Sequence, residues 1–217
     1  MNCYHTKFSN DHFSEETTIK NDGEILSVLI RGLEFTGNDF DSLSPIEELA
    51  PEQQKYLPLW DDCLCSCCIE CEIPILIYDQ CQETSGKLFV RLDLGAPAQN
   101  GGLDFAKLKI ALEHKSHIIA GSGKSGWVED ELLEIQSQLL NDVYMKACIN
   151  CLYSDYSPYG HGLFGCMMCF RNLKSEYIKV TTKQEFWSVH DRYDRMVQEI
   201  YLCSHFERRV PGIGYRG

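Results

Sequence analysis

Four cysteines in the last third of the chain stand in two pairs with the spacing of zinc ligands. Cys148 and Cys151 are separated by two residues, and the same spacing recurs fourteen residues later in Cys166 and Cys169. Two intervening residues let a tight turn aim both thiolates at one ion, and two such pairs complete the tetrahedron that Zn²⁺ prefers. The sequence therefore predicts a structural zinc ion held by these four cysteines, with no open position for catalysis.

Two further residues, Cys203 and His161, are the substitutes to consider if one of the four cysteines is not a ligand. The question arises because the fourteen-residue gap is slightly shorter than the common range. An iron–sulfur cluster is a weaker alternative, which four cysteines alone do not exclude. The spacing thus leaves the identity of one ligand open.

The stretch between the two pairs has the composition of a recognition loop. Residues 152–165 contain three tyrosines, two serines and three glycines beside one Asp and one His. Tyrosine supplies rigid contact area, while serine and glycine adapt to a partner. The predicted partner-binding residues are Tyr153, Asp155, Tyr156, Tyr159 and His161. In the competing interpretation the tyrosines pack over the zinc turns, and the glycines only shape the path of the chain.

The charge of the chain is concentrated in its first third. The net charge is −12, and residues 1–62 hold thirteen acidic residues against four basic ones. An acidic surface repels phosphate backbones and attracts basic surfaces, so a basic protein partner is expected and a nucleic acid is disfavoured. Solubility alone is the simpler explanation of the same charge.

The cysteines also bear on the compartment. The first seven residues lack the basic and apolar segments of a secretion signal, and no apolar run reaches the roughly 20 residues that span a bilayer. In a reducing compartment thiols stay free or bind metal. We therefore expect a soluble cytoplasmic protein without a membrane partner.

The elements that must position these residues follow from hydrophobic periodicity. Apolar residues alternate in the segments 25–35, 63–77, 88–94 and 107–113, and residues 117–121 form a further short strand. Helical spacing is found at residues 128–139 and again from a capping box at Thr182 to Val197. Strands that follow one another without intervening helices favour an antiparallel sheet or sandwich.

The predicted fold class is therefore α+β, with three segments. Residues 1–23 show no clean period and are expected to form an irregular lead-in. Residues 24–126 form a β-rich domain. Residues 127–217 contain a helix, the zinc-bound segment and a C-terminal helix, packed as one unit with the β-rich body.

The cysteine-rich segment that begins at Cys63 is better explained as a strand than as a second metal cluster. Its cysteines and isoleucines recur at every second position up to Ile77, and buried cysteine packs as a small apolar residue. Pro74 would restrict this strand to an edge or a bulge. A second zinc ion bound by Cys65, Cys68, Cys71 and Cys81 is the minority alternative.

Motifs for catalysis are incomplete. Residues 121–125, Gly-Ser-Gly-Lys-Ser, resemble part of a phosphate-binding loop, but Ile118 stands where that motif needs its first glycine. An enzyme would use Asp155, His161 or His190 near a cleft, yet no catalytic set is assembled by the sequence. The catalytic residues, if there are any, are unknown.

Several motifs resemble those of an uncharacterised bacterial family, a domain of unknown function. They are the residues GKSGW at 123–127, YSDYSP at 153–158 and FGCMMCFR at 164–171, together with YLC at 201–203 and GYRG at 214–217. The likeness covers mainly residues 123–217. It implies no activity, but it strengthens Cys203 as a ligand in place of Cys166.

The leading functional hypothesis is a zinc-stabilised cytoplasmic protein-binding module. It would neutralise a basic partner, such as a toxin nuclease, in the manner of an immunity protein. The alternatives are an uncharacterised enzyme with a site near residues 153–161 and a nucleic-acid-binding zinc ribbon. The oligomeric state is not indicated by the sequence.

Overall fold

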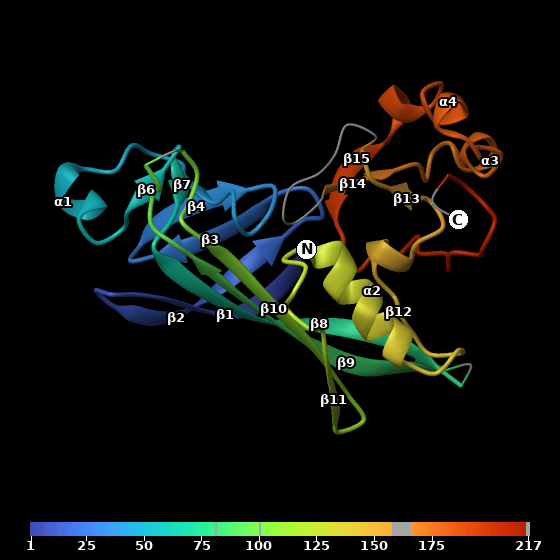
Figure 1. The fold of residues 1–217 in the computed structure, drawn as a ribbon, viewed down its shortest axis with the longest axis horizontal. Coiled ribbons are helices and arrows are strands. Elements are labelled where there is room, and N and C mark those ends of the chain that lie inside the picture. Colours follow the sequence, from blue (N-terminus) through green and yellow to red (C-terminus); the bar gives the residue numbers. More distant parts are fainter. Residues whose placement is uncertain (81, 100, 158–165, 216–217) are drawn as a thin grey trace.

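The computed structural model describes residues 1–80, 82–99, 101–157 and 166–215 (Figure 1). Its strands are β1 (Asn2–Asn10), β2 (Ser14–Asn21), β3 (Leu26–Ile30), β4 (Leu33–Gly37), β5 (Ser44–Pro45), β6 (Leu59–Trp60), β7 (Cys63–Leu64), β8 (Cys67–Asp79), β9 (Gln82–Leu94), β10 (Ala106–His114), β11 (His117–Ala120), β12 (Tyr144–Met145), β13 (Ser154–Asp155), β14 (Cys166–Cys169) and β15 (Arg195–Gln198). Its helices are α1 (Pro51–Gln54), α2 (Val128–Gln138), α3 (Lys174–Tyr177) and α4 (Lys183–Phe186), with 3₁₀ turns η1 (Cys148–Asn150) and η2 (His190–Arg192).

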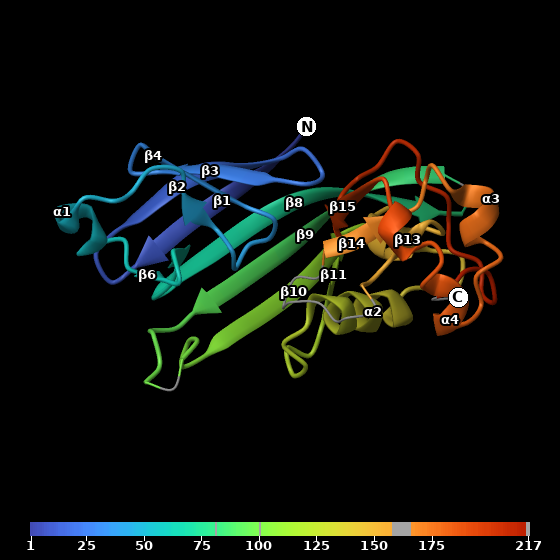
Figure 2. The same ribbon diagram turned by 90° about the horizontal axis from the view of Figure 1, so that it is seen from above.

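Ten strands form one antiparallel sheet in the order β11-β10-β9-β8-β1-β2-β3-β4-β5, with β12 paired to the far end of β8. The expected β-rich, antiparallel body is therefore confirmed. Strands β13, β14 and β15 form a separate three-stranded sheet, and β6 pairs with β7. In both views the short element α1 lies at one end of the molecule, and α3, α4 and β13 gather at the other (Figures 1 and 2).

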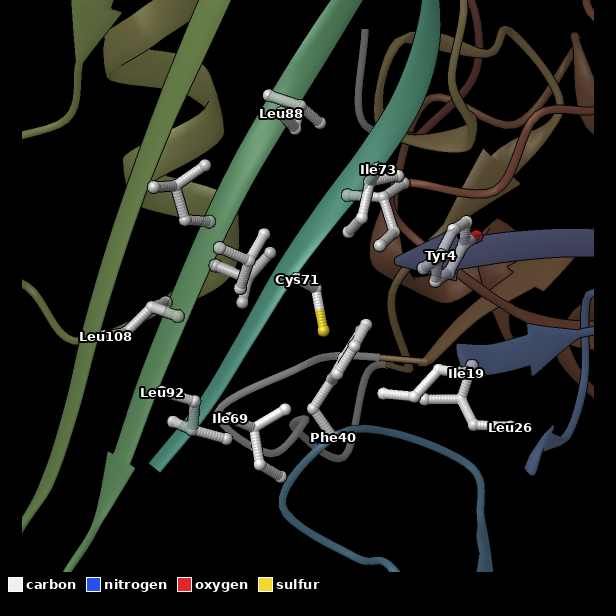
Figure 3. Packing of buried hydrophobic residues seen from close by; sticks show 14 of the residues in the cluster. Tyr4, Ile19, Leu26, Phe40, Ile69, Cys71, Ile73, Leu88, Leu92 and Leu108 are labelled. Carbon is white, nitrogen blue, oxygen red and sulfur yellow. The ribbon is translucent and has the colours of Figure 1, made fainter. Parts of the chain in front are cut away.

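Strand β8 shows why the cysteine-rich segment folds as it does. Its side chains alternate, so that Cys67, Ile69, Cys71, Ile73, Ile75 and Ile77 are all buried on one face. These residues pack against the inward face of β9 and against Phe40 and Tyr4 from the first third of the chain (Figure 3). The predicted strand with core-facing thiols is confirmed, although it begins at Cys67 rather than at Cys63.

Pro74 lies within β8, which is a central strand and not an edge. It pairs with Lys87 of β9 on one side. On the other side the ladder with β1 ends at Glu72, and the ladder with β12 begins at Ile77. Proline lacks an N–H group, so it is tolerated at this local break between two partners.

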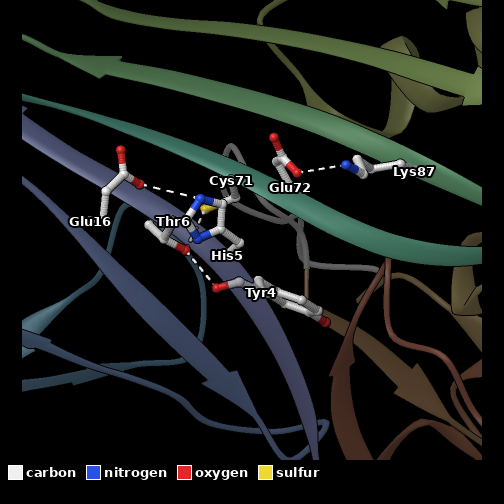
Figure 4. A network of polar contacts seen from close by, with 7 residues as sticks. All are labelled: Tyr4, His5, Thr6, Glu16, Cys71, Glu72 and Lys87. Carbon is white, nitrogen blue, oxygen red and sulfur yellow. Dashed lines mark hydrogen bonds and ion pairs between the residues drawn. The ribbon is translucent and has the colours of Figure 1, made fainter.

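Residues 1–23 are not the irregular lead-in that the sequence suggested. They form the hairpin of β1 and β2, and β1 pairs with β8 in the middle of the sheet. The alternation of β1 is hard to recognise because a polar residue, Thr6, holds a buried position between Tyr4 and Phe8. Its hydroxyl donates to the carbonyl oxygen of Tyr4 and contacts the Cys71 sulfur at 3.4 Å (Figure 4).

The segment 25–35, expected to be one strand, is a hairpin of β3 and β4. The turn residues Arg31 and Gly32 both have positive φ, at 52° and 77°. Two consecutive residues in this region are typical of a type I′ turn, whose twist matches that of the flanking strands. The apolar alternation continues through the turn, which is why the pattern alone does not reveal the break.

The helix predicted at residues 128–139 is confirmed as α2. It buries Val128, Leu132 and Ile135 and packs against β10 (Figure 2). The predicted C-terminal helix is wrong beyond its first turn. Thr182 and Glu185 form the expected capping box, but α4 ends at Phe186, and Val197 belongs to β15, which pairs with β14. Among the described residues no helix is long and apolar enough to cross a membrane.

We expect the substitution Ile73→Ala to destabilise the protein strongly. Ile73 is 0% exposed in the middle of β8, so truncation leaves a cavity that costs about 2–5 kcal/mol of unfolding free energy. The matched control is Ile118→Ala on the edge strand β11, where the side chain is 69% exposed and the cost is within about 0.5 kcal/mol. Urea unfolding of both variants measures the difference; equal losses would contradict the assignment of this core.

Candidate functional site

The first predicted cysteine pair lies in a tight turn, as zinc ligands require. Cys148 begins the 3₁₀ turn η1, and the N–H of Cys151 donates to the carbonyl oxygen of Cys148 at 3.0 Å. Both side chains are buried. This local geometry is compatible with two sulfurs directed at one ion.

The second pair lies on a strand and not in a turn. Cys166 and Cys169 are the first and last residues of β14, so their side chains point to opposite faces of the small sheet. Cys169 is buried with the main core, whereas the Cys166 thiol donates to the carbonyl oxygen of Asn38 at 3.6 Å. The strand therefore separates two residues that the spacing had suggested as joint ligands.

Cys203, rather than Cys166, lies near Cys148 and Cys169. The N–H of Cys148 donates to the carbonyl oxygen of Tyr201, and Cys203 packs against the core cluster that contains Cys148 and Cys169. Burial raises the pKa of the Cys148 thiol well above its usual value, and the neighbouring thiols of Cys151, Cys203 and Cys169 raise it further. The structure thus places Cys203 beside the hydrophobic cluster that contains Cys148 and Cys169.

These thiols do not surround a common point. Among the residues that the structure describes, no group of three or more His, Cys, Asp or Glu side chains is arranged as it would be around a metal ion. His161, the other substitute ligand, and Cys81 of the minority second cluster lie outside the described residues. Cys68 and Cys71, also named for that cluster, point to opposite faces of β8.

Two of the three predicted partner-binding tyrosines, Tyr153 and Tyr156, face the interior. Tyr153 and Tyr156 are buried, as is Asp155 between them. The Tyr153 hydroxyl donates to Glu207 at 2.9 Å, and the Tyr156 hydroxyl donates to the buried carboxylate of Glu199 at 3.1 Å. Tyr159 and His161 fall outside the described residues. The three placed side chains present almost no surface to a partner and instead hold the C-terminal segment together.

Asp155 is a structural acceptor. It accepts hydrogen bonds from the hydroxyl of Tyr177 at 2.8 Å and from the N–H of Tyr156 at 2.8 Å. Tyr177 stacks on Phe170 in the second hydrophobic cluster. His190, the other side chain considered for an enzyme, makes local contacts to the Trp187 carbonyl oxygen at 3.0 Å and to Asp191 at 2.8 Å.

Sequence reasoning missed a group of acids around Cys166. Burial, together with the negative charge of Asp39, raises the pKa of Asp41 to about 8, and Glu199 adds to this effect. Burial and the charges of Asp39, Glu199 and Asp41 likewise raise the pKa of the Cys166 thiol. Glu199 is far from the others in sequence and no local pattern links them, so only the tertiary fold reveals the group.

In the Gly-Ser-Gly-Lys-Ser segment, residues 121–125, two backbone N–H groups donate to carboxylates of the protein itself. The N–H of Ser122 donates to Glu134 at 2.8 Å, and the N–H of Gly123 donates to the buried Glu131 at 2.8 Å. A phosphate would have to displace two carboxylates to reach these donors. The segment therefore serves as a turn that anchors the start of α2.

The outer face of the main sheet carries a broad hollow of about 630 Å³ above Phe89 and Ala111. Charged side chains around it pair across neighbouring strands (Figure 4). Lys87 binds Glu72 at 2.7 Å, and Arg91 binds Glu70 at 2.9 Å. Such cross-strand pairs stabilise a solvated sheet face and neutralise one another.

A different surface lies at the end of the molecule that contains α1, and we call residues 29–62 the acidic end. This segment holds eight acidic residues against two basic ones. A hollow of about 230 Å³ lies among its side chains, lined by Leu29, Leu33, Ile46 and Leu49 and by Glu34 and Glu47. Leu29 and Ile46 are 55% and 57% exposed.

Comparison with known proteins identifies a family but no activity. A family model described as a family of unknown function (DUF6304) matches residues 3–154. The expected uncharacterised family is confirmed, and the matched segment includes the motif at 123–127 but ends before those at 164–171 and 214–217. No curated protein and no solved structure matches the chain.

The raised pKa of Asp41 predicts a loss of stability as the pH rises. Between about pH 4 and pH 8 the folded state keeps a proton that the unfolded state has released, so the unfolding free energy falls through this window. In wild-type protein this proton contributes a decrease in the unfolding free energy of up to about 1.4 kcal/mol per pH unit, and Asp41→Asn should abolish that contribution. Urea unfolding at several pH values measures the pH dependence of the unfolding free energy, and the exposed Asp130→Asn is the control. An unchanged slope in Asp41→Asn would refute the prediction.

Proposed function

We propose a function from the protein's own surface, because the chain belongs to DUF6304, a family of unknown function. The proposed function is to bind a basic protein partner through the acidic end. The observation that carries this proposal is the combination, on one end of the molecule, of unpaired carboxylates with exposed apolar side chains beside a hollow.

The carboxylates of the acidic end are available to a partner. Glu34, Glu47, Glu48, Glu52 and the turn residues Asp61 and Asp62 are exposed. Within the described ranges none of them forms an ion pair with a Lys, Arg or His. This contrasts with the outer face of the sheet, where acids are paired. Unpaired acids of one sign create a field that steers a basic protein toward this end.

The exposed apolar side chains of the acidic end supply contact area that can be desolvated on binding, which charge alone does not provide. Leu29 and Ile46 flank the hollow, and Trp60 is exposed on the neighbouring β6 strand. Binding energy at protein interfaces is concentrated in a few desolvated apolar or aromatic contacts, with charges around them. The arrangement fits a basic surface from which one apolar side chain projects into the hollow.

The class of partner follows from this chemistry. A nucleic acid is repelled by the same carboxylates, whereas a protein that binds nucleic acid presents the basic surface that they attract. We therefore retain a basic protein such as a nuclease as the partner to be neutralised, in the cytoplasm. The contact surface proposed from the sequence, residues 153–161, is replaced by the acidic end.

A structural zinc ion in the C-terminal segment is part of the same proposal. The support for it is the group of buried thiols gathered from distant parts of the sequence. Zinc would fix this segment against the sheet, and the acidic end would make the contact with the partner. The two parts can be tested separately because α1 and the exposed carboxylates beside it lie at the end of the molecule opposite to β13, α3 and α4 (Figure 2).

Charge reversal at the acidic end tests the binding function. The probe is a fluorescein-labelled peptide of Lys and Leu residues, and a peptide with Glu in place of Lys shows the background. We expect Glu47→Lys combined with Glu48→Lys to weaken binding of the Lys peptide by about tenfold or more, since each lost attraction becomes a repulsion. Fluorescence anisotropy at two salt concentrations provides the measurement.

The matched control carries the same change of charge elsewhere. Asp130→Lys on α2 combined with Asp142→Lys alters two exposed acids outside the acidic end and should change the affinity by less than about twofold. Equal weakening by both double variants would show that only the net charge matters. No binding of the Lys peptide at low salt would overturn the proposal.

A further inference from the structure

We propose that the hollow on the outer face of the main sheet binds a small molecule in which a planar aromatic group carries an acidic group. The hollow has a volume of about 630 Å³, which is within the range of ordinary small-molecule sites. Its side chains come from β1, β2, β8, β9, β10 and β11 and from the turn that follows β11. It shares no residue with the acidic end, so the two sites are tested independently.

The floor of the hollow is an aromatic ring beside two small side chains. Phe89 of β9 is half-buried on the outer face, and Ala111 lies opposite it in β10. Ala120 of β11 lies opposite Ala111 and also lines the hollow. Because two neighbouring strands carry only a methyl group at this level, the space beside the ring is open to a ligand. The Lys87 ammonium lies 5.4 Å from the ring centre, so a ligand's own ring packs from the side of the alanines.

The charged groups of the hollow that lack an ion pair are positive. Each of the three carboxylates that line it has a nitrogen partner on a neighbouring strand: Glu16 has His5 at 3.4 Å, Glu70 has Arg91 at 2.9 Å and Glu72 has Lys87 at 2.7 Å (Figure 4). Lys7 and Lys109 line the same hollow and are exposed. Within the described ranges neither of these lysines forms an ion pair. The hollow therefore attracts an anion, although the chain as a whole is acidic.

Lys109 and Arg91 form a cross-strand pair of like charge at the rim of the hollow. They lie directly opposite each other in β10 and β9, two residues along the strands from the level of Phe89. Like charges in this arrangement are destabilising. The Arg91 guanidinium is held by Glu70 at 2.9 Å and by Asp93 at 2.8 Å, which fixes its direction. An anion bound beside Lys109 would relieve the repulsion between the two cations, so this pair fits binding better than it fits stability.

The wall beside Lys109 is the turn of residues 121–123. Two N–H groups of this turn are bonded to carboxylates of α2, so the turn is fixed and its donors are not available to a ligand. A Cβ on Gly123 would lie 3.9 Å from Cγ of Lys109, which shows that the turn packs along the aliphatic part of this side chain. The acidic group of a ligand therefore meets side-chain cations here and not backbone N–H groups.

The ring and the cations are separated by a distance that one small molecule spans. Phe89 and Lys109 are diagonal neighbours on adjacent strands, and the Cα atoms of such neighbours are about 7–8 Å apart. A planar ring packed beside Phe89 places an attached carboxylate or phosphate next to Lys109 and Arg91, which donate charge-assisted hydrogen bonds. An anion without a ring lacks the first contact, and a ring without a charge lacks the second. The ligand class is therefore an aromatic anion.

Calorimetric titration of the full chain with aromatic anions tests this site. The probes are naphthoate, which carries a carboxylate, and adenosine monophosphate, which carries a phosphate. The controls are neutral naphthamide and the non-aromatic cyclohexanecarboxylate. We expect saturable binding of at least one probe at low salt with a Kd of about 1 mM or lower, and binding of both controls that is weaker by about fivefold or more. The probe that binds more tightly shows whether the acidic group is a carboxylate or a phosphate.

Substitutions at the rim and the floor locate the bound molecule. Lys109→Glu should weaken binding by about tenfold or more, and its urea midpoint should not fall, because the new carboxylate lies opposite Arg91. Ala111→Leu fills the hollow without a change of charge and should abolish binding. The matched control is Lys55→Glu, which makes the same charge change at the end of α1, outside the hollow, and should alter the affinity by less than about twofold.

Urea unfolding with and without the probe shows whether each variant is folded. The bound probe should raise the midpoint of the wild-type protein and of Lys55→Glu but not that of Ala111→Leu. No saturable binding of either anion, or equally tight binding of naphthamide, would overturn the proposed ligand class. Binding at wild-type affinity in both Lys109→Glu and Ala111→Leu would overturn the proposed site.

Discussion

The structure depends on the pairing of β8 with three other strands. On one side it is bonded to β9 over thirteen residues, and on the other side it is shared between β1 and β12. Its inward side chains are the isoleucines and cysteines that the main core is built upon. Because side chains in a strand alternate strictly, a register shift of one residue would expose this entire row to solvent. The positions of β1 and β9 are therefore fixed by the burial of a single strand.

The C-terminal segment is joined to this sheet by polar contacts as well as by packing. The side-chain amide of Gln198 in β15 donates to the carbonyl oxygens of Glu24 and Asn38, which lie before β3 and after β4. The hydroxyl of Tyr156 reaches Glu199, the next residue after this strand. These contacts therefore tie the C-terminal segment to both ends of the β3–β4 hairpin. The tyrosines that resemble a recognition loop in the sequence belong to this inner network.

What could be predicted from the sequence was governed by local patterns. The alternation in β8 to β10 and the helical spacing in α2 each gave the correct element, whereas the capping box at Thr182 gave only the first turn of the helix expected there. The hairpin of β1 and β2 was missed because Thr6 and Asn21 occupy core positions, and Asn21 is satisfied there by donating to the Tyr4 hydroxyl at 2.8 Å. The strand at Cys166–Cys169 depends on pairing with β15, and the acids around Cys166 come from distant segments. Neither feature has a local signal.

The order of strands in the sheet has a consequence during synthesis of the chain. Strand β1 leaves the ribosome before its neighbour β8, which follows only after β2 to β7 have been made. At about 5–20 residues per second, the open edge of the nascent hairpin waits for some seconds with Tyr4 and Phe8 unshielded. During that interval the unpaired N–H and C=O groups at the edge of β1 can pair with strands of other nascent chains. The speed of translation between β1 and β8 therefore sets how long this edge of the sheet remains unpaired.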